Sequence, residues 1–166
     1  MTGILYAKKP IALFLAAGYE EATAVYYLEQ LRKAGLPVSL IGINDQPIRG
    51  RHGINLLPDS TIATLPSDIA FHIILISGGC QHVNSMLIDP RIHKLLHKTI
   101  NAHGFIAPLP NIESIFLRSG FSHDKFSPHI IKQGAMNANK YINHLIHLAE
   151  SSASTVTKAT ETNIFS

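Results

Sequence analysis

Short apolar runs that alternate with segments of helical spacing restrict this chain to few folds. Three of the runs cover residues 11–16, 38–43 and 71–76. Strands that are apolar throughout are buried on both faces, and strands separated by helices pair in parallel. The sequence therefore predicts an α/β fold, with helices on both faces of a mainly parallel sheet.

The helical segments have recognisable ends. Residues 20–34 carry apolar side chains at helical spacing, and Gly35 ends that helix. A second helix is expected over residues 90–101, where Pro90 suits the first turn, and a final helix over residues 135–149. The other segments are expected as a loop with a short hairpin (47–58), a turn or short helix (59–65), a strand from 105 to 107 and a short helix (112–118), with no clear prediction for 119–133.

Length and composition indicate one domain. The chain has 166 residues, of which 46% are hydrophobic and 15% charged, enough apolar material for a packed core. We expect a single domain over residues 1–150. Residues 151–166 hold eight Ser or Thr among sixteen, so this segment is expected to be a mobile tail.

The charge balance excludes two classes of partner. The formal net charge is +3, from 14 Lys and Arg against 11 Asp and Glu, too small to predict attraction to nucleic acid or to a membrane surface. No apolar run approaches the ~20 residues of a membrane span.

Cys80 is the one cysteine, which excludes an intrachain disulfide and indicates a reducing compartment. We therefore expect a cytoplasmic protein.

No metal or cofactor motif stands out. His93 and His97 are four residues apart and His144 and His147 three, spacings that can support metal binding, but no Cys, Asp or Glu accompanies them at matching spacing. Residues 77–80 lack the glycine pattern of a phosphate- or dinucleotide-binding loop. Neither a metal nor a cofactor is therefore expected.

Several short motifs follow one another in an order that is more specific than any of them alone. From about residue 9 to residue 111, the chain resembles the DJ-1/PfpI (ThiJ/PfpI) family. The resemblance implies a flavodoxin-like three-layer α/β/α sandwich, like that of class I glutamine amidotransferases, which is commonly dimeric. The motifs are Gly18-Tyr19-Glu20-Glu21, the helix end Leu31-Arg32-Lys33-Ala34-Gly35, Leu57-Pro58-Asp59, Ile76-Ser77-Gly78-Gly79 and Gly104-Phe105-Ile106-Ala107.

The resemblance also implies a kind of site. Active members of the family use a cysteine at a sharp turn between a strand and a helix, a glutamate from the first helix and often a nearby histidine. Paired glycines after a central strand offer backbone N–H groups to an oxyanion. The activities of such members include glyoxalase or deglycase, peptidase, hydratase and chaperone functions.

This chain departs from that pattern at the nucleophile, whose position is taken by Pro110. Proline fixes φ at about −65° and carries no N–H, so it removes the thiol and with it the strained nucleophile turn. Thr23 stands at the glutamate position, although Glu20 and Glu21 come just before it. His129 falls at the histidine position if one residue is inserted. The glycine pair, Gly78 and Gly79, is intact.

Two hypotheses follow for the function. The first is a non-catalytic family member, or pseudoenzyme, that acts as a binding, regulatory or chaperone-like module and forms a homodimer. The second is a cysteine-dependent enzyme, of glyoxalase, deglycase or hydrolase type, rebuilt around Cys80. In that enzyme His82 or Glu20 would serve as acid or base and the glycine pair as oxyanion donors.

Simpler explanations exist for the same residues. Cys80 can be a small turn residue, and Glu20 and Glu21 can simply interact with the dipole at a helix start. His52 stands where some relatives carry an arginine, and with its basic neighbours Arg49 and Arg51 it offers a place for a small anion. Loop solubility explains these three residues equally well.

Overall fold

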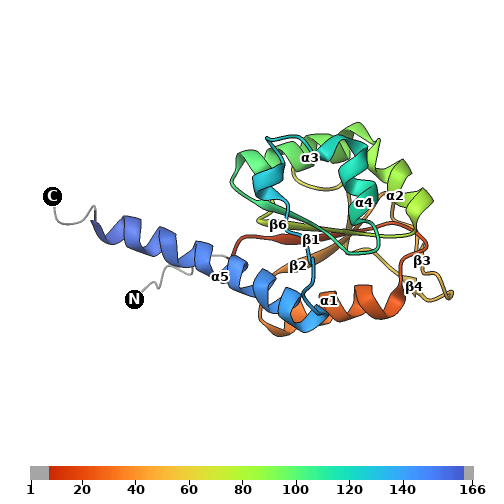
Figure 1. The fold of residues 1–166 in the computed structure, drawn as a ribbon, viewed down its shortest axis with the longest axis horizontal. Helices are drawn as coiled ribbons and strands as arrows, with labels where there is room; N and C mark the ends of the chain where they lie inside the picture. The colour runs from red at the N-terminus through yellow and green to blue at the C-terminus, as the bar shows by residue number, and fades with distance from the viewer. Residues whose placement is uncertain (1–7, 163–166) are drawn as a thin grey trace.

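The computed structural model describes residues 8–162, with side chains as far as Ser151. Its main sheet has five parallel strands in the order β5-β2-β1-β6-β7 (Figure 1). This sheet confirms the predicted α/β fold, and all three apolar runs form its central strands. The strands are β1 (Ile11–Leu15), β2 (Val38–Gly42), β5 (Ser60–Thr61), β6 (Ile73–Ser77) and β7 (Phe105–Pro108).

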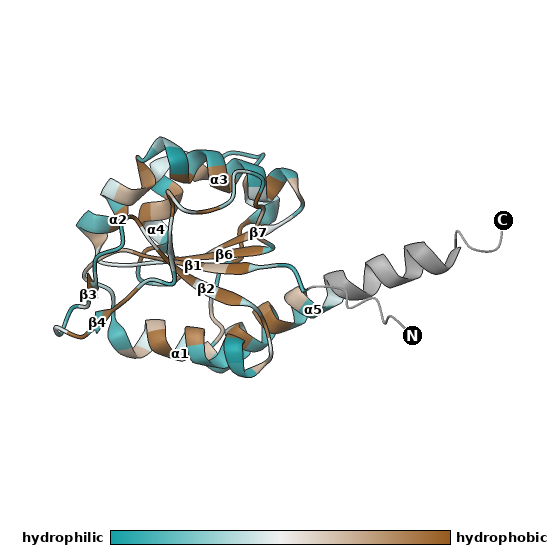
Figure 2. Ribbon diagram, turned by 180° about the vertical axis from the view of Figure 1, so that it is seen from behind, coloured by the Kyte–Doolittle hydropathy of each residue, from teal (hydrophilic) through white to brown (hydrophobic). Residues whose placement is uncertain are grey.

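Helices cover both faces of this sheet (Figure 1). One face carries α1 (Glu21–Lys33) and α5 (Ala138–Thr162), and the other carries α2 (Cys80–Leu87), α3 (Pro90–Asn101) and α4 (Glu113–Phe116). Alternate residues of β1 enter the two layers, because successive side chains of a strand point to opposite faces. Leu13 packs toward α1, whereas Phe14 packs toward α3. Apolar residues accordingly line the strands and the inner helix faces in Figure 2.

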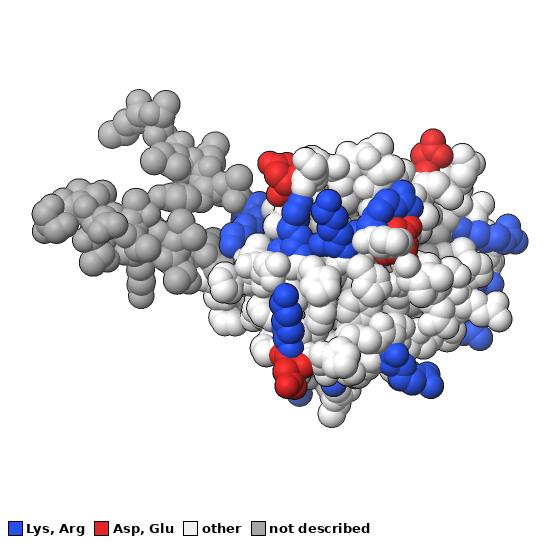
Figure 3. Space-filling model, turned by 90° about the horizontal axis from the view of Figure 1, so that it is seen from above, with Lys and Arg blue, Asp and Glu red and all other residues white. Residues whose placement is uncertain are grey.

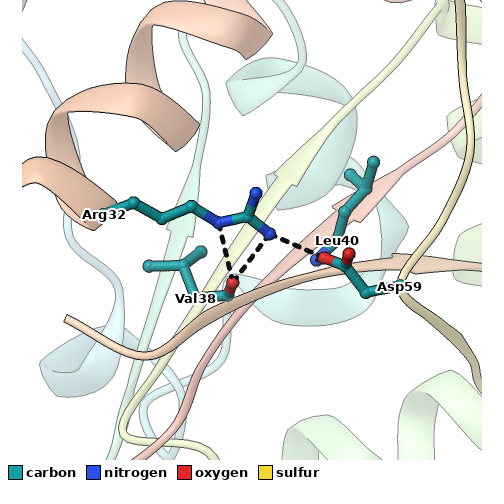
Figure 4. Close-up of polar contacts among 4 residues, drawn as sticks. All are labelled: Arg32, Val38, Leu40 and Asp59. Carbon is teal, nitrogen blue, oxygen red and sulfur yellow. Dashed lines mark hydrogen bonds and ion pairs between the residues drawn. The ribbon is translucent and has the colours of Figure 1, made fainter.

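The end of α1 is tied to the sheet by one side chain. The Arg32 guanidinium donates to the Val38 carbonyl oxygen at 3.0 and 3.1 Å and to Asp59 Oδ2 at 2.7 Å (Figure 4). Asp59 Oδ2 also accepts the Leu40 N–H at 2.7 Å. The Leu57-Pro58-Asp59 motif therefore joins a helix end to β2 and to the approach to β5.

Two short elements differ from expectation. Residues 59–65 were expected as a turn or helix, but β5 pairs there with β2 through Ile41 and Ser60; a two-residue strand is too short to leave a pattern in the sequence. No bounds were predicted for a helix over α2, whose apolar stripe is limited to Val83, Met86 and Leu87. The predicted hairpin is present, with β3 (Ile48–Arg49) and β4 (Asn55–Leu56).

The carboxyl-terminal part of the chain needs the largest correction. A helical turn, η1 (Leu117–Phe121), and a 3₁₀ turn, η2 (Ser127–His129), occupy the region without a clear prediction. The final helix was expected to end at residue 149, but α5 continues to Thr162. The predicted boundary at residue 150 thus falls within a helix, and residues 163–166 of the predicted tail lie outside the described residues.

Basic side chains gather over the face that α3 covers (Figure 3). Arg91, Lys94 and Lys98 are exposed or half-buried there and follow helical spacing, so they share one side of the helix although no basic run exists in the sequence. No helix within residues 8–162 combines the length and apolar character that crossing a membrane requires.

Candidate functional site

A pocket of about 410 Å³ lies at the carboxyl edge of the sheet, beyond the ends of β1 and β6. Ligands of parallel α/β sheets bind at this edge, where the strand order reverses. Here the order reverses at β1, whose neighbours are β2 and β6. The pocket is lined by Gly18, Glu20, Arg51, Gly78, Gly79, Cys80 and Asn111.

Glycines bring the ends of β1 and β6 together at this pocket. Gly18 has a φ of +75°, and a Cβ there would lie 3.1 Å from the Gly79 Cα. A Cβ at Gly78 would lie 2.6 Å from the Ala16 Cβ, so no larger residue fits. The two loops can therefore pass this closely only because they carry glycine.

The glycine pair does not form the expected pair of oxyanion donors. The Gly79 N–H donates to the Ala17 carbonyl oxygen at 2.8 Å, so it is already used to hold the two loops together. The Gly78 carbonyl oxygen accepts from Asn111 Nδ2 at 3.0 Å. Asn111, which follows β7, is thereby fixed beside the pocket.

Cys80 is exposed at the first residue of α2, on the pocket wall. Its predicted partner His82 lines a different pocket, together with Ser85 and Met86. Residues two apart on a helix point in different directions. The side chains of Cys80 and His82 make no hydrogen bond with each other among the described residues, and their pairing stays a prediction.

Two charged side chains share the pocket with Cys80. Glu20 is exposed at the start of α1. Arg51 comes from the turn of the β3–β4 hairpin, which is held over the pocket because the Arg51 N–H donates to the Tyr19 carbonyl oxygen at 2.8 Å. Neither side chain has a hydrogen bond or ion pair with another part of residues 8–162. Both are therefore available to a ligand.

Glu21 has a structural partner instead. Its buried carboxylate accepts from the His52 N–H at 2.6 Å and the Ile54 N–H at 3.4 Å, and its Oε2 lies 3.1 Å from His52 Nδ1. Burial raises the pKa of the Glu21 carboxyl, but the hydrogen bonds from its own N–H, from His52 and from Ile54 outweigh burial and lower the pKa to about 2. Glu21 thus fastens α1 to the hairpin.

The residues at the degenerate family positions lie apart. Pro110 is exposed in the turn after β7. It does not have a positive φ, because His103 is the one non-glycine residue with a positive φ among residues 8–162. Thr23 lines a groove between α1 and the start of α5. His129 Nδ1 lies 2.9 Å from the Gly104 carbonyl oxygen, at the opposite end of β7 from Pro110. A four-residue strand separates these ends by about 13 Å.

Sequence reasoning missed Asn111 and undervalued Arg51. Asn111 lies three residues after the end of β7, a position close to the carboxyl edge of the sheet. Arg51 was considered only with its basic neighbours, because its contact with the Tyr19 carbonyl depends on the hairpin. No group of three or more His, Cys, Asp or Glu in the described part of the chain is close enough to hold a metal ion.

Comparisons with known proteins agree with this architecture. The model of the DJ-1/PfpI family matches residues 9–119. "Protein dj-1beta" of Drosophila melanogaster is 26% identical over 118 residues, which cover 70% of this chain and 63% of that protein. "Parkinson disease protein 7 homolog" of Danio rerio is 23% identical over 118 residues and 62% of its length. The chain thus spans less than two thirds of these curated relatives.

Solved structures extend the likeness to most of the chain. The crystal structure of Drosophila melanogaster DJ-1beta has a TM-score of 0.70 at 19% identity, over 90% of this chain and 98% of that one. The structure of oxidized Toxoplasma gondii DJ-1 has a TM-score of 0.70 at 18% identity over the same shares. At such identities the likeness shows the fold, which is the flavodoxin-like sandwich that the sequence predicted.

Proposed function

This chain belongs to the DJ-1/PfpI family, and we propose that it is a member without the family's cysteine chemistry, which binds a small organic acid in the pocket beside Cys80. The observation that carries the proposal is the pairing of Pro110 at the nucleophile position with an open pocket that holds unpaired charges. A lost nucleophile removes the reaction, whereas a pocket with free polar groups retains the means to bind.

The polar groups of the pocket define the class of ligand. The Arg51 guanidinium is suited to a carboxylate, which it can bind through two N–H groups. The amino end of α2 adds partial positive charge on the same side. Glu20 would repel a second carboxylate but can accept a hydrogen bond from a hydroxyl or amino group. The ligand is accordingly a small acid that also carries a hydroxyl or an amine.

Lactate tests this proposal, with propionate as the analogue that lacks the hydroxyl. We expect lactate to shift the backbone amide NMR signals of Gly78, Gly79 and Cys80, and Arg51→Gln to weaken binding about tenfold, because a charge-assisted hydrogen bond is lost. Arg49→Gln, which removes the same charge two residues earlier, is the matched control. Equal affinity of the wild type and Arg51→Gln would refute the proposed site.

A second candidate is a cysteine-dependent enzyme, favoured by one observation: Cys80 is exposed in the same pocket as Glu20 and Arg51. Methylglyoxal consumption distinguishes the two candidates. The binding protein consumes none above the buffer rate. Consumption that Cys80→Ser abolishes would establish the enzyme, and rapid alkylation of Cys80 by iodoacetamide, read by intact mass, would accompany it.

We also propose that the protein forms a homodimer through the face that α1 and the hairpin share. Val25 and Ile54 are 43% and 56% exposed there, and they line one pocket of about 430 Å³ with Glu21 and His52. Exposed apolar side chains around such a hollow are typical of an interface. Val25→Asp should convert a dimer into a monomer in sedimentation velocity, and a monomeric wild type at micromolar concentration would contradict the proposal.

The cytoplasm remains the predicted location, and it rests on the single cysteine of the chain. The proposal includes no cofactor and no nucleic-acid or membrane partner. A whole-cell fractionation with an antibody against the protein tests the location.

A further inference from the structure

A second pocket, of about 400 Å³, is lined by residues of α2, of β3 and of the end of β1. The α2 helix and the β3–β4 hairpin lie at the same end of the sheet in both ribbon views (Figures 1 and 2). Its volume lies within the range of small-molecule sites. The two pockets share no lining residue, so this one is a separate site.

The base of this pocket is apolar. Leu15, Ala16, Ile48 and Met86 line it, and each is less than a tenth exposed. They come from the end of β1, from β3 and from α2. Apolar surface of this kind, enclosed on several sides, favours a ligand with an apolar body.

Polar side chains surround that base, and most of them already have partners. The Asp89 carboxylate accepts from Arg91 Nη2 at 2.7 Å and from the Arg91 N–H at 2.9 Å. Ser85 donates to the Gln81 carbonyl oxygen at 3.2 Å. Arg49 and His82 make no side-chain hydrogen bond or ion pair within the described part of the chain.

We propose that this pocket binds a small carboxylic acid with an apolar, ring-sized body. The body lies against Ile48 and Met86, and the carboxylate pairs with Arg49, the one lining cation without a partner among the described residues. His82 supplies a second hydrogen-bond donor. The Asp89 charge does not oppose this arrangement, because Arg91 neutralises it.

The probe for this site is 2-naphthoate, followed by its own fluorescence anisotropy, which a chain without tryptophan does not obscure. The uncharged 2-naphthamide tests the need for the carboxylate. Arg49→Gln removes the cation, and Ser85→Phe fills the pocket from an exposed position of α2. Arg51→Gln, in the Cys80 pocket, and Ser114→Phe, at an exposed position of α4, are the matched controls, and circular dichroism checks that every variant folds.

We expect 2-naphthoate to bind, and both 2-naphthamide and Arg49→Gln to weaken binding about tenfold. Ser85→Phe should abolish binding, and both controls should bind like the wild type. Three results would each overturn the inference: no anisotropy change at millimolar protein, equal affinity for the acid and the amide, or binding that survives Ser85→Phe. A loss confined to Arg51→Gln would also overturn it, because the ligand would then lie beside Cys80. Since lactate and 2-naphthoate are measured separately, either proposal can fail alone.

Discussion

Glu21 illustrates how one side chain can look like a site residue and serve the structure instead. The sequence places it next to Glu20, at the start of a helix. In the folded chain the two carboxylates have different surroundings. Glu20 lines the Cys80 pocket, whereas Glu21 contacts the hairpin and accepts hydrogen bonds from the backbone N–H groups of His52 and Ile54. A Cβ at Gly50 would collide with the Glu21 carboxylate, so the fit requires glycine there.

The lowered pKa of Glu21 gives a pH prediction at the scale of one residue. Since its pKa falls from 4.5 to about 2 on folding, the ionised carboxylate contributes stability that is fully present above pH 4.5 and is lost as the pH falls toward 2. Glu21→Gln should therefore be less stable than the wild type at pH 7, and the difference should shrink by pH 3.

The measurement is the thermal unfolding midpoint of both proteins between pH 7 and pH 3. Glu20→Gln is the control, because the Glu20 side chain is exposed and makes no hydrogen bond with the described residues. A gap between wild type and Glu21→Gln that stays constant over this range would contradict the assigned contacts.

At the scale of elements, Asp59 joins α1, β2 and the approach to β5. Its carboxylate accepts from Arg32 and from the Leu40 N–H. The ion pair is nearly half exposed, so it contributes little by itself. The hydrogen bond from the Leu40 N–H contributes more to stability, because a backbone N–H within strand β2 that loses its acceptor lowers the free energy of unfolding.

We expect Asp59→Ala to lower the free energy of unfolding by about 1–2 kcal/mol. Urea unfolding measures the change, and Asp68→Ala, at an exposed position outside these contacts, is the control. Arg32→Met should cost less than Asp59→Ala, because it leaves the Leu40 N–H with its acceptor. The reverse order would show that the ion pair, rather than the backbone contact, dominates.

At the scale of the whole molecule, histidines held between elements make stability depend on pH. His72 is buried, and its Nε2 lies 3.2 Å from the Leu148 carbonyl oxygen. His97 packs against the Phe126 ring at 4.8 Å. Burial lowers the pKa of both imidazoles, aided by Lys9 at His72 and by Lys125 and His93 at His97.

The pKa of His72 and of His97 is below the ordinary 6.5 in the folded state, so these imidazoles bind protons in the unfolded chain at a higher pH than in the folded chain. The stability is therefore complete above about pH 6.5 and falls as the pH drops below it. We expect the free energy of unfolding in urea to decrease from pH 7.5 to pH 5. His97→Gln should reduce that decrease, and His147→Gln, at an exposed position of α5, should not. A decrease of equal size in all three proteins would exclude His97 as a source.

Much of the fold could be predicted from the sequence. The three central strands, α1, α3 and the hairpin were expected close to their observed bounds, because each leaves a pattern of apolar spacing or turn residues within a short window. The observed bounds of α5 were not predicted. The short elements β5 and α2 were not predicted either, because two to eight residues leave little pattern in a sequence and contacts with the sheet stabilise such elements.

The sequence by itself determined the layered α/β fold, the family and the absence of a thiol at residue 110. Only the tertiary structure decided which side chains meet. Glu20, Arg51, Cys80 and Asn111 come from four separate segments, and they gather because parallel strands in the order β5-β2-β1-β6-β7 bring those segments to one edge. Local spacing reports the neighbours of a residue along the chain, whereas proximity across loops depends on the order in which strands pair.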